Sequence, residues 1–421
     1  MQSSIKLRLT VMNFLQFAVW GAYLTSMGRY LGTAGFGSEI GNFYAMQGLV
    51  SLFMPALMGI VADRWIPAQR LLGVCHMLAG MLMLGVFLYT QTDAPSYPSL
   101  FALYSLSVAF YMPTLALSNS VAYTSLDQAG LDLVKSFPPI RVFGTVGFIC
   151  TMIAVSLLGL EATSGQFAVS AIISLVLAVY AQTLPNCPTA PKGQSKSLVE
   201  ALGLRAFVLF KQRKMALFFI FSMLLGVSLQ ITNGFANPFI STFGEIPAYA
   251  DTFGVKYANI LISLSQLSET LCILLIPFAL RRFGIRRVML IAMVAWVLRF
   301  ALLGLGNPGS GVWLFLLSMI VYGVAFDFFN VSGSLFVDQE TDPSIRSSAQ
   351  GLFMIMTNGI GATLGSLGAQ AVINHFVYSE HDTTAILAGW SMSWYVFAAY
   401  AAVVAVLFAL LFRYNTATEA K

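Results

Sequence analysis

The chain is built of apolar runs of about 20 residues, separated by short polar breaks, along nearly its whole length. A helix of about 20 residues crosses the ~30 Å hydrocarbon layer of a bilayer. Only 9% of the 421 residues are charged, against about 25% in soluble domains. Barrel strands would alternate polar and apolar residues, so runs this uniform satisfy their backbone groups in lipid as helices. We predict an all-α polytopic membrane protein with twelve transmembrane helices, at residues 8–31, 39–61, 71–91, 98–124, 139–160, 166–185, 214–241, 257–280, 286–305, 311–336, 347–373 and 389–412.

The distribution of positive charge predicts how the chain is oriented. Of the 22 Lys and Arg residues, all but four fall in predicted loops and tails on the N-terminal side of the membrane. Arg29 and Lys256 fall on the opposite side, and Arg141 and Arg299 fall within spans. The positive-inside rule therefore places both termini in the cytoplasm. The excess of Lys and Arg in the cytoplasmic loops accounts for the net charge of +5, so no nucleic-acid partner is expected.

The two halves of the chain resemble each other. The longest polar break, residues 186–213, separates six predicted spans from six. PPIR at Pro138–Arg141 matches PSIR at Pro343–Arg346, and VAFY at Val108–Tyr111 matches VAFD at Val324–Asp327. Duplicated halves of this kind are typical of transporters that rock about a central site. We predict three parts: an N-terminal six-helix bundle at 1–185, a cytoplasmic central loop at 186–213 and a C-terminal six-helix bundle at 214–421.

Two carboxylates, Glu269 and Asp327, lie within apolar spans. An ionised side chain at bilayer depth costs about 2.5–3.5 kcal/mol, so such residues usually face a polar cavity and have a function. Gln266 precedes Glu269 by three residues and shares its helix face. Our hypothesis is that proton loading neutralises Asp327 or Glu269 and lets the carrier reorient. The alternative is a fixed buried ion pair that holds the bundle together.

Polar and aromatic residues recur at helical spacing in three spans, one of which is the span that holds Asp327. Arg141, Thr145 and Phe148 follow Pro138-Pro139, which predict the start of the fifth helix, and lie on one face. Gln230 and Asn233 are three residues apart and carry amides that can donate and accept at one ligand. Tyr322 and Phe326, four residues apart, can stack on a flat ligand. The alternatives are that Arg141 reaches the headgroups and that the amides join neighbouring helices.

Several segments resemble known transporters. Gly59, Asp63 and Arg64, with Arg70, resemble the loop 2–3 signature of the major facilitator superfamily, although its usual glycine after the Asp-Arg pair is absent. The chain resembles the bacterial nucleoside:proton symporters more closely, a family that includes general nucleoside permeases and a xanthosine permease. The segments that carry this resemblance are Phe14–Gly21, Phe53–Asp63, Phe137–Phe148, Phe221–Asn233, Ser263–Thr270 and Ser318–Ser334.

The resemblance implies two pseudo-symmetric bundles that work by alternating access, with a purine or pyrimidine nucleoside bound at the midplane between them. It implies a monomer in the bacterial inner membrane, driven by the proton gradient without a metal or other cofactor. Asp327 and Glu269 are expected to couple protons, and Asp63, Arg64 and Arg70 to form a conformational latch. Arg299, in a helix that is peripheral in this superfamily, is given no substrate role. The residues expected to bind the nucleoside are Arg141, Thr145, Phe148, Gln230, Asn233, Gln266, Glu269, Tyr322 and Phe326.

Three other functions remain open. A xanthosine-selective permease is one, because Ser118–Ser120 and Pro138–Phe143 resemble the xanthosine permease somewhat more closely. A proton-coupled carrier of another polar solute, a sugar or a drug, is the second. An intramembrane enzyme or receptor is the third. The sequence has no His/Glu metal motif, no Ser-His or Ser-Lys nucleophile in its spans and no Walker loop, and is therefore not expected to be an enzyme or ATP-driven.

Overall fold

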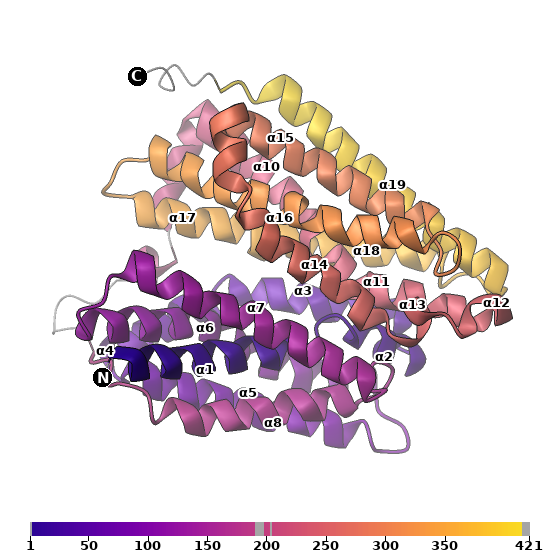
Figure 1. The fold of residues 1–421 in the computed structure, drawn as a ribbon, viewed down its shortest axis with the longest axis horizontal. Helices are drawn as coiled ribbons and strands as arrows, with labels where there is room; N and C mark the ends of the chain where they lie inside the picture. Colours follow the sequence, from indigo (N-terminus) through magenta and orange to yellow (C-terminus); the bar gives the residue numbers. More distant parts are fainter. Residues whose placement is uncertain (1, 190–197, 203, 415–421) are drawn as a thin grey trace. The chain divides into compact units, whose positions relative to one another are not determined.

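The computed structural model describes residues 2–189, 198–202 and 204–414, and these are helical along most of their length (Figure 1). No β-strand occurs in these ranges, so the all-α prediction is confirmed. Nine helices of the described chain are long and apolar enough to cross a membrane, and α8 and α14 are shorter apolar helices. Helices cover every one of the twelve predicted spans. Part of the predicted central loop, with Lys192 and Lys196, lies outside the described residues.

The chain folds into two compact units. Unit 1 consists of Met1–Phe36 and Met46–Leu202, and unit 2 of Gly37–Ala45 and Gly203–Lys421. The predicted boundaries at 185 and 214 stay a prediction. The helices of unit 1 are α1 (Gln2–Gly21), α2 (Met27–Thr33), the second half of α3 (Ile40–Ser51), α4 (Met54–Arg64), α5 (Ala68–Tyr89), α6 (Tyr97–Gln128), α7 (Leu133–Leu157), α8 (Gly165–Ala181) and α9 (Leu198–Ala201).

In unit 1, α1 packs along α7 and α8, and α5 packs along α6 and α8. Glycine allows α1 and α7 to approach closely. A Cβ on Gly147 would lie 2.1 Å from the carbonyl oxygen of Phe14, and one on Gly21 would lie 2.4 Å from that of Phe148. Small residues bring helix backbones together in this way where no hydrophobic driving force acts between helices in lipid.

Unit 2 is built around α15 and α16, which pack along each other over much of their length (Figure 1). The α15 helix also packs along α19, α14 along α16, and α10 along a π-helical segment, η4, that leads into α18. The elements of this unit are η2 (Leu204–Lys211), α10 (Arg213–Leu229), α11 (Ile231–Thr242), η3 (Phe243–Glu245), α12 (Pro247–Ala250), α13 (Phe253–Lys256), α14 (Ala258–Ile273), α15 (Ile276–Leu305), α16 (Val312–Glu340), α17 (Arg346–Met354), η4 (Ile355–Gly361), α18 (Ala362–Phe376) and α19 (Thr383–Leu411).

Two predicted spans are interrupted, and one predicted helix start is wrong. The eighth span is interrupted after Ile273, where α14 ends, and resumes at Ile276 with Pro277 in the first turn of α15; the helical backbone of α15 is then broken at Gly284, whose φ is 75°, so the eighth span runs up to that glycine. A proline is well placed there, since the first helical turn does not use its N–H groups. The fifth helix does not begin at Pro138-Pro139 but at Leu133, so both prolines lie inside α7. The seventh span is divided at Gln230 between α10 and α11.

The segment Gly37–Ala45 belongs to unit 2 because it is tied to α18. The amide of Gln370 donates to the carbonyl oxygen of Gly37 at 3.0 Å and accepts from the backbone N–H of Gly41. Asn374 donates to the carbonyl oxygen of Ser38 at 3.1 Å. Two side-chain amides thus pair with two carbonyl oxygens just before α3 and with one N–H of its first turn, where a helix leaves N–H groups without helical partners.

Candidate functional site

The predicted polar stripe of unit 1 lies on α7. The guanidinium of Arg141 stacks over the ring of Phe17, with its central carbon 4.1 Å from the ring centroid. Phe148 is buried and meets Trp20 edge to face, at 6.4 Å between centroids. Thr145 lies between them on the same helix and is half-buried. A cation held on an aromatic face is stabilised by the ring quadrupole, so α7 and α1 together present a charge bordered by aromatic surface.

In unit 2, the break between α10 and α11 carries two amides. Gln230 is the residue at which the two helices meet. The Asn233 amide nitrogen donates to the Gln230 side-chain oxygen at 2.7 Å, and both side chains are half-buried. The structure therefore brings these two predicted residues together. Asn237, further along α11, is fully buried and donates to Asn259 at 2.9 Å, so its amide joins two helices.

The α14 helix presents Gln266 and Glu269 one turn apart. The side-chain oxygen of Gln266 is buried and has no hydrogen-bond partner among the described residues. Glu269 is half-buried. A buried acceptor without a partner costs about 1–3 kcal/mol, and most such groups in proteins are satisfied. A ligand donor would remove that cost at Gln266.

The α16 helix adds a stacked ring pair and an acid. Tyr322 and Phe326 lie 5.5 Å apart between centroids at an interplanar angle of 19°. Asp327 is 5% exposed, and its Oδ2 has no hydrogen-bond partner in the described part of the chain. Its carboxyl group lies near enough to that of Glu269 for their charges to interact. The salt bridges found in the described ranges do not include Asp327, so the fixed ion pair gains no support there.

Arg299, to which no role was given, lies over the ring of Tyr322. It is 2% exposed, and its guanidinium carbon is 4.4 Å from the centroid of the Tyr322 ring. The sequence did contain the signal, because a cation in the middle of an apolar span is as unusual as Glu269 or Asp327. The expectation that its helix is peripheral obscured that signal.

The predicted latch residues lie at one end of unit 1. Asp63 and Arg64 form the last turn of α4, and Arg70 is the third residue of α5. Arg64 and Arg70 are exposed. Their latch role stays a prediction.

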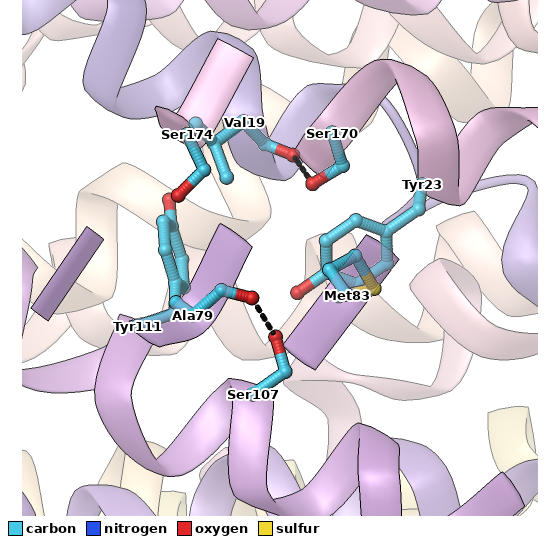
Figure 2. Close-up of a pocket in the computed structure, with 8 residues that line it drawn as sticks. All are labelled: Val19, Tyr23, Ala79, Met83, Ser107, Tyr111, Ser170 and Ser174. Carbon is cyan, nitrogen blue, oxygen red and sulfur yellow. Dashed lines mark hydrogen bonds between the residues drawn. The ribbon is translucent and has the colours of Figure 1, made fainter. Parts of the chain in front are cut away.

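Unit 1 also contains a cavity that none of the site residues described above lines (Figure 2). Its volume is about 10 Å³, room for about one water molecule and far below the roughly 300–1,000 Å³ of ordinary ligand pockets. Two serines on its wall already donate to backbone carbonyl oxygens: Ser107 to Ala79 and Ser170 to Val19, each at 2.8 Å. None of the predicted substrate residues lines it. We do not assign the substrate to this cavity.

Comparisons with known proteins identify the family of the chain. The xanthosine permease of Escherichia coli (strain K12) is 49% identical over 98% of this chain and 97% of its own length, and the nucleoside permease NupG of the same strain is 46% identical with the same coverage. The crystal structure of the nucleoside transporter NupG superposes with a TM-score of 0.89 at 45% identity, covering 98% of this chain and 100% of that one. An auto-inhibited POT family peptide transporter shares the fold, with a TM-score of 0.69 at 16% identity, over 100% of this chain and 98% of its own. The family model for nucleoside H⁺ symporters matches residues 3–417, and the chain belongs to that family.

Proposed function

We propose that the protein imports nucleosides together with protons by alternating access. The residues proposed to bind the substrate are the polar and aromatic side chains described above, on α7 in unit 1 and on α11, α14 and α16 in unit 2. The observation that carries the proposal is the group of side chains in unit 2, where the unpartnered Gln266 oxygen, the stacked rings of Tyr322 and Phe326 and two neighbouring acids occur together. Amides and a carboxylate match the donors and acceptors of a sugar and a base edge. Aromatic rings stack on any base face, at about 1–3 kcal/mol per base.

The roles of the individual side chains follow from their chemistry. Gln266 and Glu269 bind hydroxyl or base polar groups, and Gln230 and Asn233 add a second amide edge. Tyr322, Phe326 and Phe148 offer ring faces. Arg141 and Thr145 contribute a cation and a hydroxyl from α7. Asp327, buried and free of salt bridges in the described chain, carries the coupled proton, with Glu269 as its neighbour.

Xanthosine is the second candidate substrate. The E. coli xanthosine permease is slightly more similar to this chain than NupG is, at 49% against 46% identity. Both relatives cover the same share of the chain. Substrate competition separates the two candidates.

The test is uptake of radiolabelled uridine into proteoliposomes, with and without an inward proton gradient, in the presence of excess adenosine, xanthosine or glucose. We expect gradient-dependent uptake that adenosine blocks and glucose does not. Gradient-dependent uptake of xanthosine but not of uridine would establish the selective permease. Absence of uptake and binding for both nucleosides would refute the proposed function.

The cellular setting completes the proposal. The protein is a multi-pass membrane protein. We place it as a monomer in the bacterial inner membrane with both termini in the cytoplasm, which follows from the excess of Lys and Arg on one side. The proton gradient supplies the energy without a further cofactor. Reporter fusions at the two termini test the orientation, and native mass spectrometry in detergent tests the monomer.

A further inference from the structure

Arg299 is a fully buried cation in the C-terminal half of α15 that no salt bridge of the described residues neutralises. Its guanidinium is instead held by oxygens of three other helices. Nη1 donates to the carbonyl oxygen of Ser318 at 2.9 Å and to the Ser265 hydroxyl at 3.3 Å, and Nη2 donates to the Thr232 hydroxyl at 3.2 Å. A charged group at this depth is costly, so its position requires an explanation.

Each of these contacts lies beside a residue proposed to bind the nucleoside. Thr232 precedes Asn233 on α11, Ser265 precedes Gln266 on α14, and Ser318 lies one turn before Tyr322 on α16. The planar guanidinium has five N–H donors in fixed directions, so it can connect several acceptors at set angles. One side chain thereby links the three helices that carry the unit 2 residues of the proposed site.

The guanidinium also stacks against the ring that is proposed to contact the base. Its central carbon lies 4.4 Å from the Tyr322 centroid, while Phe326 stacks on Tyr322 and Trp296 meets it edge to face at 5.9 Å. A cation on a ring face gains energy from the ring quadrupole, most of all in a desolvated setting. Tyr322 is thus fixed by a cation, a parallel ring and a perpendicular ring.

We propose that Arg299 is the positioning residue of the unit 2 half of the nucleoside site. It holds the Tyr322 ring in place and sets the mutual positions of α11, α14 and α16, without touching the substrate itself. This inference rests on the proposed function. Lysine keeps the charge but loses the planar fork, so it cannot reproduce the three directed contacts and the stacking together.

The test compares Arg299→Lys with Arg286→Lys. Arg286 lies in the same helix, two residues after the break at Gly284 and 13 residues before Arg299, and it also donates to backbone carbonyl oxygens, those of Phe412 and Ala409, at 2.7 Å each. Uridine and xanthosine affinities are measured on purified, monodisperse protein, alongside the KM and Vmax of uptake. We expect Arg299→Lys to raise Kd and KM about tenfold with Vmax changed less than about twofold, since tenfold corresponds to the loss of roughly one charged hydrogen bond. Arg286→Lys should leave Kd within about twofold of the wild type.

A double-mutant cycle separates positioning from general packing. In a Tyr322→Leu background, Arg299→Lys should change Kd much less than it does in the wild type, because residues that act through each other are not additive. Full additivity, or an unchanged Kd for Arg299→Lys, would overturn the inference.

Two milder variants keep the inference testable if Arg299→Lys does not fold. Thr232→Val and Ser265→Ala each remove one oxygen that accepts from Arg299 and leave the charge in place. Each should raise Kd by about three- to fivefold, and wild-type affinity in both would refute the role. If the wild-type protein binds neither uridine nor xanthosine, the proposed function fails. If the wild type binds but these variants behave like it, only the role of Arg299 fails.

Discussion

Replacing Asp327 by asparagine should uncouple nucleoside movement from the proton gradient. The two side chains have the same shape, but asparagine cannot take up and release a proton. A carrier that moves one proton per nucleoside can concentrate its substrate about tenfold for each pH unit, because one unit is worth 1.36 kcal/mol, or roughly a factor of ten. We expect Asp327→Asn to accumulate uridine to no more than the outside concentration, while exchange of internal for external uridine continues.

The structure also sets the expected stability of this variant. Oδ2 of Asp327 is buried without a hydrogen-bond partner in the described chain, and the new amide nitrogen can occupy that place. A buried donor without a partner costs about 1–3 kcal/mol, which should lower the melting temperature without unfolding the protein. Glu269→Gln, in contrast, should weaken uridine binding as well as accumulation, since Glu269 is proposed to touch the substrate.

The assay is uptake into proteoliposomes across one pH unit, beside counterflow exchange without a gradient. Glu161→Gln is the matched control, because Glu161 is a buried carboxylate of unit 1 that pairs with Arg29 at 3.3 Å. This control should keep gradient-driven accumulation even if it is less stable. Accumulation by Asp327→Asn above the outside concentration would refute the proposed proton carrier.

Three further predictions concern stability. Gly365→Ala places a Cβ 2.0 Å from a backbone oxygen of α10 and should destabilise the protein by about 1–3 kcal/mol. Gly368→Ala is the control, because a Cβ there meets no atom within 4 Å, and its thermal unfolding should match that of the wild type. Gln370→Ala removes the partner of two backbone groups at the start of α3 and should speed amide exchange there, read by mass spectrometry. The hydroxyl and the N–H of Ser344 donate hydrogen bonds to Asp342 and thereby lower its pKa. The turn that Asp342 forms with Ser344 should therefore be stable at neutral pH and loosen as the pH falls through that lowered pKa. Amide exchange of this turn that stays unchanged at acid pH would contradict the prediction.

The sequence predicted the helices well and some of their ends poorly. Hydrophobic length and low charge are local properties, and they sufficed for twelve spans. The break at Gln230 and the start of α7 before Pro138 were missed. Whether a helix continues through a proline or is interrupted depends on the helices packed against it. Because those neighbouring helices are distant in sequence, the local pattern does not reveal the outcome.

For the candidate site as well, the sequence predicted some features and the tertiary structure decided the others. The unusual cost of charge in lipid identified Glu269 and Asp327 from the sequence alone, and helical spacing identified Gln266, Tyr322 and Phe326. The same cost applied to Arg299, yet a cation in an apolar helix looks the same in sequence whether it reaches the headgroups or lies in the core. Composition and periodicity therefore determined that the chain is a helical membrane protein and which polar residues are candidates. Tertiary structure alone decided that the guanidinium of Arg299 packs on the Tyr322 ring, because the sequence of a helix does not specify which neighbouring helices its faces will contact.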